Sequence, residues 1–190
     1  SRATPQRLAG PVVPPAAGDV GAGQEAGIGA EIANYRITEV RVQVGDAVKK
    51  GQVLARIASD TVASELAEAL ASVAELDASA VEAKGNAERA KELKEKGFYS
   101  SQLNTQYQTA QNTAQARLAA ARARQQAADL KMSKTAVLAP DDGVISARSA
   151  TVGSLTQPGQ ELFRLIRGGR LEWRAEVPSA DLAKVSAGAV

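Results

Sequence analysis

Residues 44–54 read VGDAVKKGQVL, and residues 152–162 read VGSLTQPGQEL. The Val-Gly pair, the Gly-Gln pair and the final leucine fall at the same spacing in both stretches. Glycines placed at two successive turns supply the positive φ angles that a strand-turn-strand unit needs. The repeat therefore predicts two matching halves of a small, pseudo-twofold β sandwich, one over residues 32–58 and the other over residues 136–168.

Short strands are expected around these turns. Val40, Val42 and Val44 alternate with polar residues, which is the period of a half-buried strand. Residues 52–57 form the next expected strand, and residues 137–145, VLAPDDGVI, predict a strand, a turn and another strand. Residues 1–31 are rich in proline and glycine and are interpreted as a linker or a weakly ordered strand.

Between the two halves, apolar residues recur in steps that alternate between four and three, which is the heptad pattern of a coiled coil. Strong helix formers fill the other positions. Gly97 interrupts the pattern where a helix should end, and the short connection requires the two helices to fold back antiparallel. The sequence thus predicts an α-helical hairpin over residues 59–135, with its tip near residues 94–101. The expected seam of the first helix consists of Val62, Leu66, Ala69, Val73, Leu76, Ala80, Ala83, Ala87 and Ala90.

The second helix is expected to begin near Ser101 and to reach about Lys134. Its seam would shift register at a stutter between Ala114 and Leu118. The seam residues expected before and after that shift are Leu103, Tyr107, Ala110, Ala114, Leu118, Ala121, Gln125, Ala128 and Met132. Ser59 or Asp60 could cap the first helix, and Ser100 or Ser101 the second.

Composition excludes several classes of function. The 190 residues contain no Cys, no His and one Met, so thiolate, imidazole and most thioether metal sites are excluded, as are Ser-His-Asp and Cys-His catalytic sets. Lys and Arg number 23 against 21 for Asp and Glu, without a basic run interleaved with aromatics, so nucleic acid is not an expected partner. No apolar run reaches the roughly 20 residues of a membrane span. No enzymatic activity and no cofactor are expected, and the missing initiator Met indicates a trimmed chain.

The residues of the first half resemble the biotinyl/lipoyl carrier fold. The resemblance rests on residues 45–54, GDAVKKGQVL, followed far downstream by residues 139–143, APDDG. In carriers, the modified lysine stands on a hairpin between the two halves, just after an acidic residue. Here Thr61 stands at that place, after Asp60, and a helical insertion replaces the hairpin. Attachment of lipoate or biotin is therefore not expected, because no amine is present.

A lipoyl-like domain split by a helical hairpin resembles the periplasmic adaptor, or membrane fusion protein, family of tripartite efflux pumps. The resemblance covers about residue 32 to the C-terminus. It implies an α+β fold, in which a lipoyl-like β sandwich is split by a long antiparallel coiled-coil hairpin. It also implies that residues 169–190 are the incomplete start of a β-barrel domain.

The same resemblance implies partners, a location and a site. The partners would be an inner-membrane efflux transporter, a TolC-type outer-membrane channel and further copies of the chain in a ring. The protein would lie in the periplasm, anchored to the inner membrane by a segment absent from this chain. Arg89, Leu93 and Ser100 keep the spacing of the family's Arg-x3-Leu-x6-Ser motif, so they would contact the channel. A transporter of the resistance-nodulation-division class is favoured, drugs or other small molecules are the expected cargo, and a metal-efflux adaptor is disfavoured by the missing His and scarce Met.

Other interpretations stay open from sequence. Arg89 could be a solvated surface residue, Leu93 a last seam contact and Ser100 a helix cap. The chain could be a lipoyl or biotinyl carrier domain, an adaptor of an ATP-driven exporter, or a structural coiled coil held by a β clamp.

Overall fold

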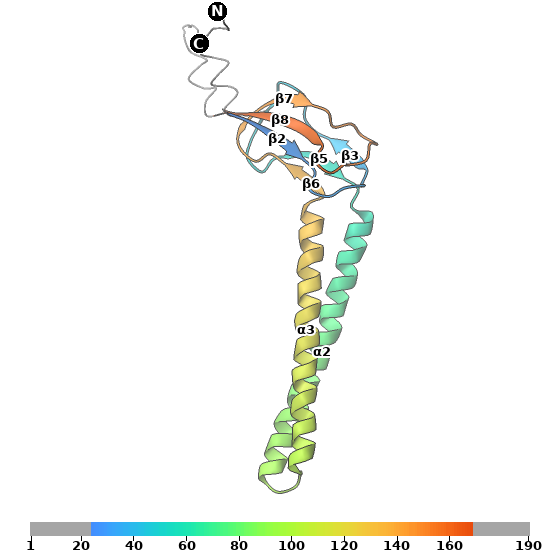
Figure 1. The fold of residues 1–190 in the computed structure, drawn as a ribbon, viewed down its shortest axis with the longest axis vertical. Helices are drawn as coiled ribbons and strands as arrows, with labels where there is room; N and C mark the ends of the chain where they lie inside the picture. Colours follow the sequence, from blue (N-terminus) through green and yellow to red (C-terminus); the bar gives the residue numbers. More distant parts are fainter. Residues whose placement is uncertain (1–23, 169–190) are drawn as a thin grey trace, which may run out of the picture. The chain divides into compact units, whose positions relative to one another are not determined.

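A computed structural model describes residues 24–168, which divide into two compact units. Within the described residues, one unit contains residues 24–58 and 134–168, and the other is Ser59–Ser133. The expectations for residues 1–23 and for a β-barrel start at residues 169–190 lie outside the described residues. Figure 1 shows the strands of the first unit and the two helices of the second.

The first unit contains two antiparallel sheets. The sheet with order β2-β8-β7-β4 has four strands, and the sheet with order β3-β5-β6 has three. The first sheet consists of β2 (Glu25–Gly29), β8 (Glu161–Arg167), β7 (Gly143–Arg148) and β4 (Ala47–Val48). The second consists of β3 (Ile37–Val40), β5 (Val53–Ile57) and β6 (Ala136–Leu138).

Pairing between strands confirms the internal repeat. In the first half β3 pairs with β5 so that Ile37 lies opposite Ile57, and in the second half β7 pairs with β8 so that Ile145 lies opposite Leu165. The same equivalence relates the β5-β6 pair to the β8-β2 pair. Each sheet is built on one equivalent pair, and each also takes a strand from the other half, because β6 joins β5 and β4 joins β7.

The two repeated turns exchange hydrogen bonds between the halves. Gly45 N donates to Ile145 O at 2.8 Å, and at the equivalent place Gly153 N donates to Ile37 O at 2.8 Å. Both glycines have the positive φ that the repeat predicted, +98° and +94°. Because each turn bonds to the opposite half, neither half satisfies its backbone alone.

The core of the sandwich lies between the sheets and is built from equivalent positions. On β5, Leu54 and Ile57 are at most 2% exposed, and on β8, Leu162, Phe163 and Leu165 are at most 1% exposed. Burial of each such side chain stabilises the fold by about 1.5–3 kcal/mol.

Two sequence predictions for the sandwich were wrong in detail. Residues 25–29 belong to the segment interpreted above as a linker or a weakly ordered strand; they form β2 along β8, so the sandwich begins before residue 32. The strand predicted through Val40, Val42 and Val44 ends at Val40, since Val42 is buried outside any strand and Val44 is 61% exposed. The physical reason is local: Gln43 N donates to the Asp46 carboxylate at 2.9 Å, so a side chain replaces a neighbouring strand as its partner.

The second unit is an antiparallel helical hairpin made of α2 (Asp60–Glu95) and α3 (Ser101–Ser133) (Figure 1). All the predicted seam positions of α2 are buried or half-buried, as the heptad pattern indicated. On α3 one prediction was wrong: Ala110 is exposed and Gln111 is half-buried. The two successive four-residue steps therefore run from Leu103 through Tyr107 to Gln111, so the stutter lies nearer the tip than Ala114.

The start of α2 lies where carrier proteins have the hairpin with the modified lysine. Ser59 occupies the N-cap position but its side chain makes no capping hydrogen bond, whereas Asp60 places a negative charge in the first turn. Thr61 lies exposed in that same turn. The place where a carrier presents its lysine is therefore the beginning of a helix.

Candidate functional site

The bend of the hairpin begins where α2 ends at a glycine. Gly97 has φ +85°, and its N–H donates to Lys94 O at 3.0 Å. Phe98 N donates to Leu93 O at 2.8 Å, which completes a Schellman motif. The last carbonyls of α2 are thus satisfied within the bend, and its backbone has a defined shape.

Ser100 caps the helix that follows. Leu103 N donates to Ser100 Oγ at 3.1 Å, so the cap expected at this position is present. The hydroxyl oxygen acts as an acceptor in this bond, which leaves the hydroxyl hydrogen to donate elsewhere. A structural role for Ser100 is therefore compatible with an outward contact.

The other two motif residues lie on the last turns of α2. Arg89 is exposed and its guanidinium donates to the Asn86 side chain, whereas Leu93 is half-buried. Residues four apart share one face of a helix, so Arg89 and Leu93 are neighbours. Ser100 follows directly after the bend. Within the bend, the Tyr99 N–H also donates to Leu93 O at 3.2 Å. The structure places the three residues at the hairpin tip; their contact with a channel stays a prediction.

Phe98 is an additional tip residue, which the sequence prediction did not include among the site residues. Its side chain is 76% exposed, an unusual environment for phenylalanine. Tyr99, by contrast, stacks on Tyr107 with ring centroids 6.2 Å apart and an interplanar angle of 16°. Phe98 could have been identified from sequence by its position, because it is an aromatic residue directly after the glycine that ends a helix.

Side chains that commonly bind metal ions are few in the described part of the chain. It contains no His or Cys, and within residues 24–168 no three acidic side chains come together as a metal-binding group. Neither α2 nor α3 is long and apolar enough to cross a bilayer. The tip presents a hydrophobic ring, a guanidinium and a hydroxyl, which suit protein contacts.

Comparison with known proteins agrees with this architecture. The family model of the CzcB-like barrel-sandwich hybrid domain matches residues 25–166. The chain is similar to the nickel-cobalt-cadmium resistance protein NccB of Alcaligenes xylosoxydans xylosoxydans, with 32% identity over 87% of this chain and 41% of NccB. It is also similar to the nickel and cobalt resistance protein CnrB of Cupriavidus metallidurans, with 32% identity over 80% of this chain and 38% of CnrB. The chain thus spans about two fifths of these relatives.

Among solved structures, the fold is similar to a MacA-MexA chimeric protein that contains the α-hairpin domain of Pseudomonas aeruginosa MexA. The TM-score is 0.55 at 23% identity, covering 75% of this chain and 46% of the chimera. At this identity the likeness concerns the fold alone. The family match over most of the described residues shows that the chain belongs to the family of the CzcB-like barrel-sandwich hybrid domain.

Proposed function

We propose that this chain is the sandwich and hairpin of a periplasmic adaptor that joins an inner-membrane exporter of divalent metal ions to a TolC-type outer-membrane channel. The observation that carries the proposal is the helical hairpin inserted between two matching halves of a sandwich in a chain of this family. The adaptor role is mechanical, so it needs no catalytic group.

Metal ions replace drugs as the proposed cargo because of the relatives' names. NccB and CnrB are named for resistance to nickel and cobalt, and NccB also for cadmium. This runs against the expectation above, which disfavoured a metal-efflux adaptor. That expectation was drawn from the missing His and scarce Met, which bear on metal binding by the chain itself and not on the ion that a transporter carries. Selectivity for the ion would then belong to the transporter, and one of the resistance-nodulation-division class remains the proposed partner.

The tip is the proposed contact with the channel. Leu93 and Phe98 would enter an apolar groove between channel helices, because they are the apolar side chains available at the bend. Arg89 and the Ser100 hydroxyl would donate hydrogen bonds to exposed channel carbonyls. Since the Schellman motif and the Ser100 cap hold the backbone, little conformational entropy would be lost on docking.

A resistance assay tests the function. A host that lacks the gene is complemented with the full-length protein or with Leu93→Asp, and growth is measured in nickel, cobalt and cadmium and in a panel of drugs and dyes. The wild type is expected to restore metal tolerance, and the variant to lose it. Leu130→Asp is the matched control, because Leu130 is 57% exposed on α3 far from the tip and should retain full tolerance.

Cross-linking tests the docking contact separately. A photoreactive residue at position 93 should yield adducts with the outer-membrane channel, whereas the same residue at position 130 should not. Equal tolerance for Leu93→Asp and wild type, or absence of tip adducts, would contradict the tip assignment. If the wild type restores tolerance to drugs but not to metals, the proposed cargo would be small organic molecules and not metal ions.

A further inference from the structure

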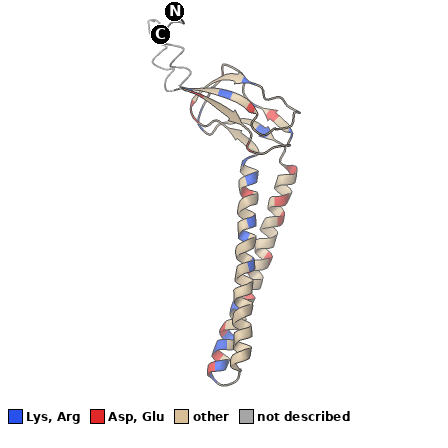
Figure 2. Ribbon diagram, viewed as in Figure 1, with Lys and Arg blue, Asp and Glu red and all other residues tan. Residues whose placement is uncertain are grey.

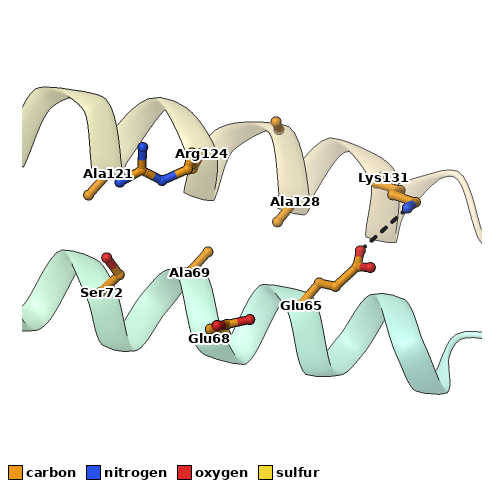
Figure 3. A pocket seen from close by; sticks show the side chains of 9 residues that line it. Glu65, Glu68, Ala69, Ser72, Ala121, Arg124, Ala128 and Lys131 are labelled. Carbon is orange, nitrogen blue, oxygen red and sulfur yellow. Dashed lines mark hydrogen bonds and ion pairs between the residues drawn. The ribbon is translucent and has the colours of Figure 1, made fainter.

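In the half of the hairpin away from the bend, charged side chains connect the two helices. Lys131 Nζ on α3 lies 3.3 Å from Glu65 Oε1 on α2, and Arg122 on α3 lies 3.6 Å from Asp77 on α2. Figure 3 shows the first of these ion pairs beside a groove of about 450 Å³, which acidic residues of α2 and basic residues of α3 line. All four paired side chains are more than a third exposed, so salt screens both pairs and each contributes little to stability.

In the half near the bend, α3 carries no charge. Residues 101–116, SQLNTQYQTAQNTAQA, contain no Asp, Glu, Lys or Arg. Figure 2 shows this stretch of α3 in tan, whereas the end of α2 beside it carries both acidic and basic residues. Ion pairs between α2 and this part of α3 are therefore impossible, and only neutral side chains can connect the helices there.

Gln108 makes a polar connection between the helices in this neutral half. Its Nε2 donates to Ala87 O on α2 at 3.0 Å and to Asn104 Oδ1 on its own helix at 3.2 Å. An amide nitrogen carries two hydrogens, and both are used here. Gln108 and Asn104 are half-buried and Ala87 is 1% exposed, so the connection is better shielded from water than the exposed ion pairs are. The Gln108 side chain is therefore held in one orientation, across the two helices.

The bond from Gln108 ends on the turn of α2 that carries Arg89. Ala87 O also accepts the N–H four residues later in the helix, so Gln108 holds the helical turn that includes Arg89. On the other helix, Asn104 N donates to Ser100 O at 3.0 Å, so Asn104 belongs to the first turn of α3, which Ser100 caps. Arg89 and Ser100 are therefore connected twice, once through the bend and once through the Gln108 amide.

The helix α2 has a weak point just before this turn. Gly85 lies in the helix interior, where glycine is the least favourable residue apart from proline. A Cβ at this position would meet Arg89 Nη1 at 3.7 Å, which is an ordinary contact, so packing among the described residues does not require a glycine. Backbone freedom at Gly85 favours bending of the tip end of α2, and the bond from Gln108 to Ala87 O opposes that bending.

We propose that Gln108 is a positioning residue of the hairpin tip. Its amide holds the last turns of α2 against α3 beyond the weak point at Gly85, and so fixes the spacing between Arg89 and Ser100. Gln108 acts through these residues and does not itself bind the channel, since both of its amide hydrogens are already used. This inference rests on the proposed docking to a channel, to which it adds the residue that keeps the docking site in shape.

A distance measurement within α2 tests the bending. The chain has no Cys, so Ala78→Cys/Lys94→Cys places two spin labels at exposed positions on either side of Gly85, about 24 Å apart along the helix. With Gln108 present, the labels should give one narrow distance distribution. Gln108→Met keeps the length of the side chain but removes the donor, so the distribution should broaden toward shorter distances. Adding Gly85→Ala should make it narrow again, because alanine strengthens the helix at the weak point.

Gln106→Met is the matched control for this measurement. Gln106 is exposed on the same neutral stretch of α3, and its side chain makes no hydrogen bond within residues 24–168, so the distribution should stay narrow. Far-ultraviolet circular dichroism verifies that the variants remain helical. A distribution for Gln108→Met as narrow as that with Gln108 present would overturn the proposal.

Cross-linking connects the positioning to docking. With a photoreactive residue at position 93 of the full-length protein, Gln108→Met should lower the yield of channel adducts about 5-fold, the size expected for loss of one hydrogen bond, and Gly85→Ala should restore the yield. An unchanged yield would overturn the positioning role, and so would a loss that Gly85→Ala does not restore, because Gln108 would then act by direct contact. If the unmodified tip gives no adducts while the label distances behave as expected, the proposed docking fails and the role of Gln108 in shaping the tip stands.

Discussion

The sandwich and the hairpin are held together by different kinds of core. The sandwich buries large side chains almost completely, among them Phe163, Ile37 and Ile145 at no more than 1% exposure. The buried positions of the hairpin are mostly alanines, and of the largest fully buried side chains in the described residues only Val62 belongs to it. A thin alanine seam allows two helices to approach closely, but it contributes less buried area per residue than the sandwich core. We infer that local stability is concentrated in the sandwich, while the hairpin remains easier to open.

The largest effect is expected at the centre of the sandwich. Phe163→Ala should lower the free energy of unfolding by about 3–5 kcal/mol, because it leaves a cavity between two sheets that cannot close. Denaturant titration, with hydrogen exchange of β7 and β8 amides, measures the loss. Phe98→Ala removes the same atoms from a side chain that is 76% exposed and should change stability little. Similar losses for the two variants would refute the contrast between core and tip.

A smaller loss is expected in the hairpin seam. Leu118 is 9% exposed, and Leu118→Ala should destabilise the hairpin by about 2 kcal/mol, at the low end for a buried leucine, because small neighbours let the helices close in. The thermal midpoint of the helical signal provides the measurement. Leu130→Ala, at a residue 57% exposed, is the control. A loss as large as that for Phe163→Ala would mean that the seam is as strong as the sandwich core.

The smallest effect concerns the tip. Ser100→Ala removes the acceptor for Leu103 N and should cost about 1 kcal/mol, seen as faster amide exchange in the first turn of α3. Ser101→Ala, one residue later and without a capping bond among the described contacts, should leave that exchange unchanged. If both variants behave alike, Ser100 does not cap the helix in solution.

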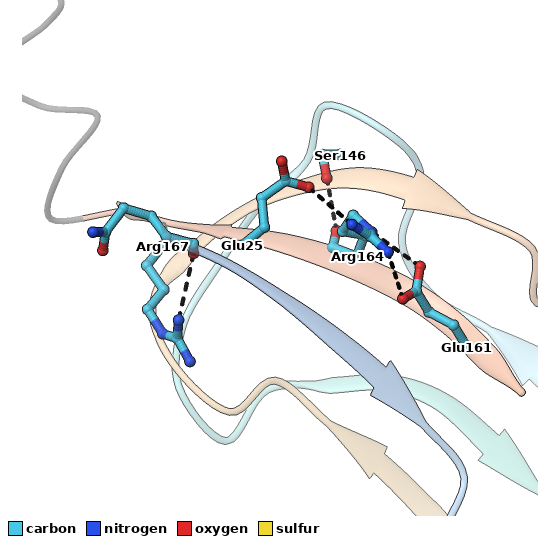
Figure 4. Close-up of polar contacts among 6 residues, drawn as sticks. Glu25, Ser146, Glu161, Arg164 and Arg167 are labelled. Atoms are coloured by element: carbon cyan, nitrogen blue, oxygen red, sulfur yellow. Dashed lines mark hydrogen bonds and ion pairs between the residues drawn. The ribbon is translucent and has the colours of Figure 1, made fainter. Parts of the chain in front are cut away.

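Some elements of the fold could be predicted from the sequence, and others could not. The glycines of the repeat predicted the turns correctly, because positive φ is a local requirement that few other residues meet. The strand β2 was left undecided between a linker and a weakly ordered strand, since its residues EAGIG carry two glycines and weak alternation. Its pairing depends on contacts remote in sequence, such as Glu25 Oε1 with Arg164 at 3.5 Å (Figure 4).

The surroundings of Arg164 illustrate such remote contacts. Hydrogen bonding to Glu161 on the same strand, at 2.9 Å, and then the nearby charges of Glu161 and Glu25 raise the pKa of the guanidinium above its ordinary value. Ser146 Oγ donates to Arg164 O at 3.3 Å from the neighbouring strand β7 (Figure 4). Arg164 on β8 thus connects the preceding strand β7 with β2, which is remote in the sequence.

The hairpin tip also has some features that were predictable from sequence and others that were not. The spacing of Arg89, Leu93 and Ser100 was readable in sequence, and a cap was expected at Ser100 or Ser101, of which the structure shows Ser100. The exposure of Phe98 was not, because it depends on how Tyr99 packs on Tyr107 and leaves the other ring outside. The groove lined by charges of both signs also needed the antiparallel register of the two helices, which no single heptad pattern specifies.

By itself, the sequence determined the periods, the turn glycines, the helix limits and the absence of a carrier lysine, because backbone conformation and covalent chemistry are set within a few residues. Only the tertiary structure decided which strand lies beside β8, where the seam of α3 shifts, and which charges face one groove. Those features depend on the packing of segments distant in the chain, where burial and pairing outweigh local preference.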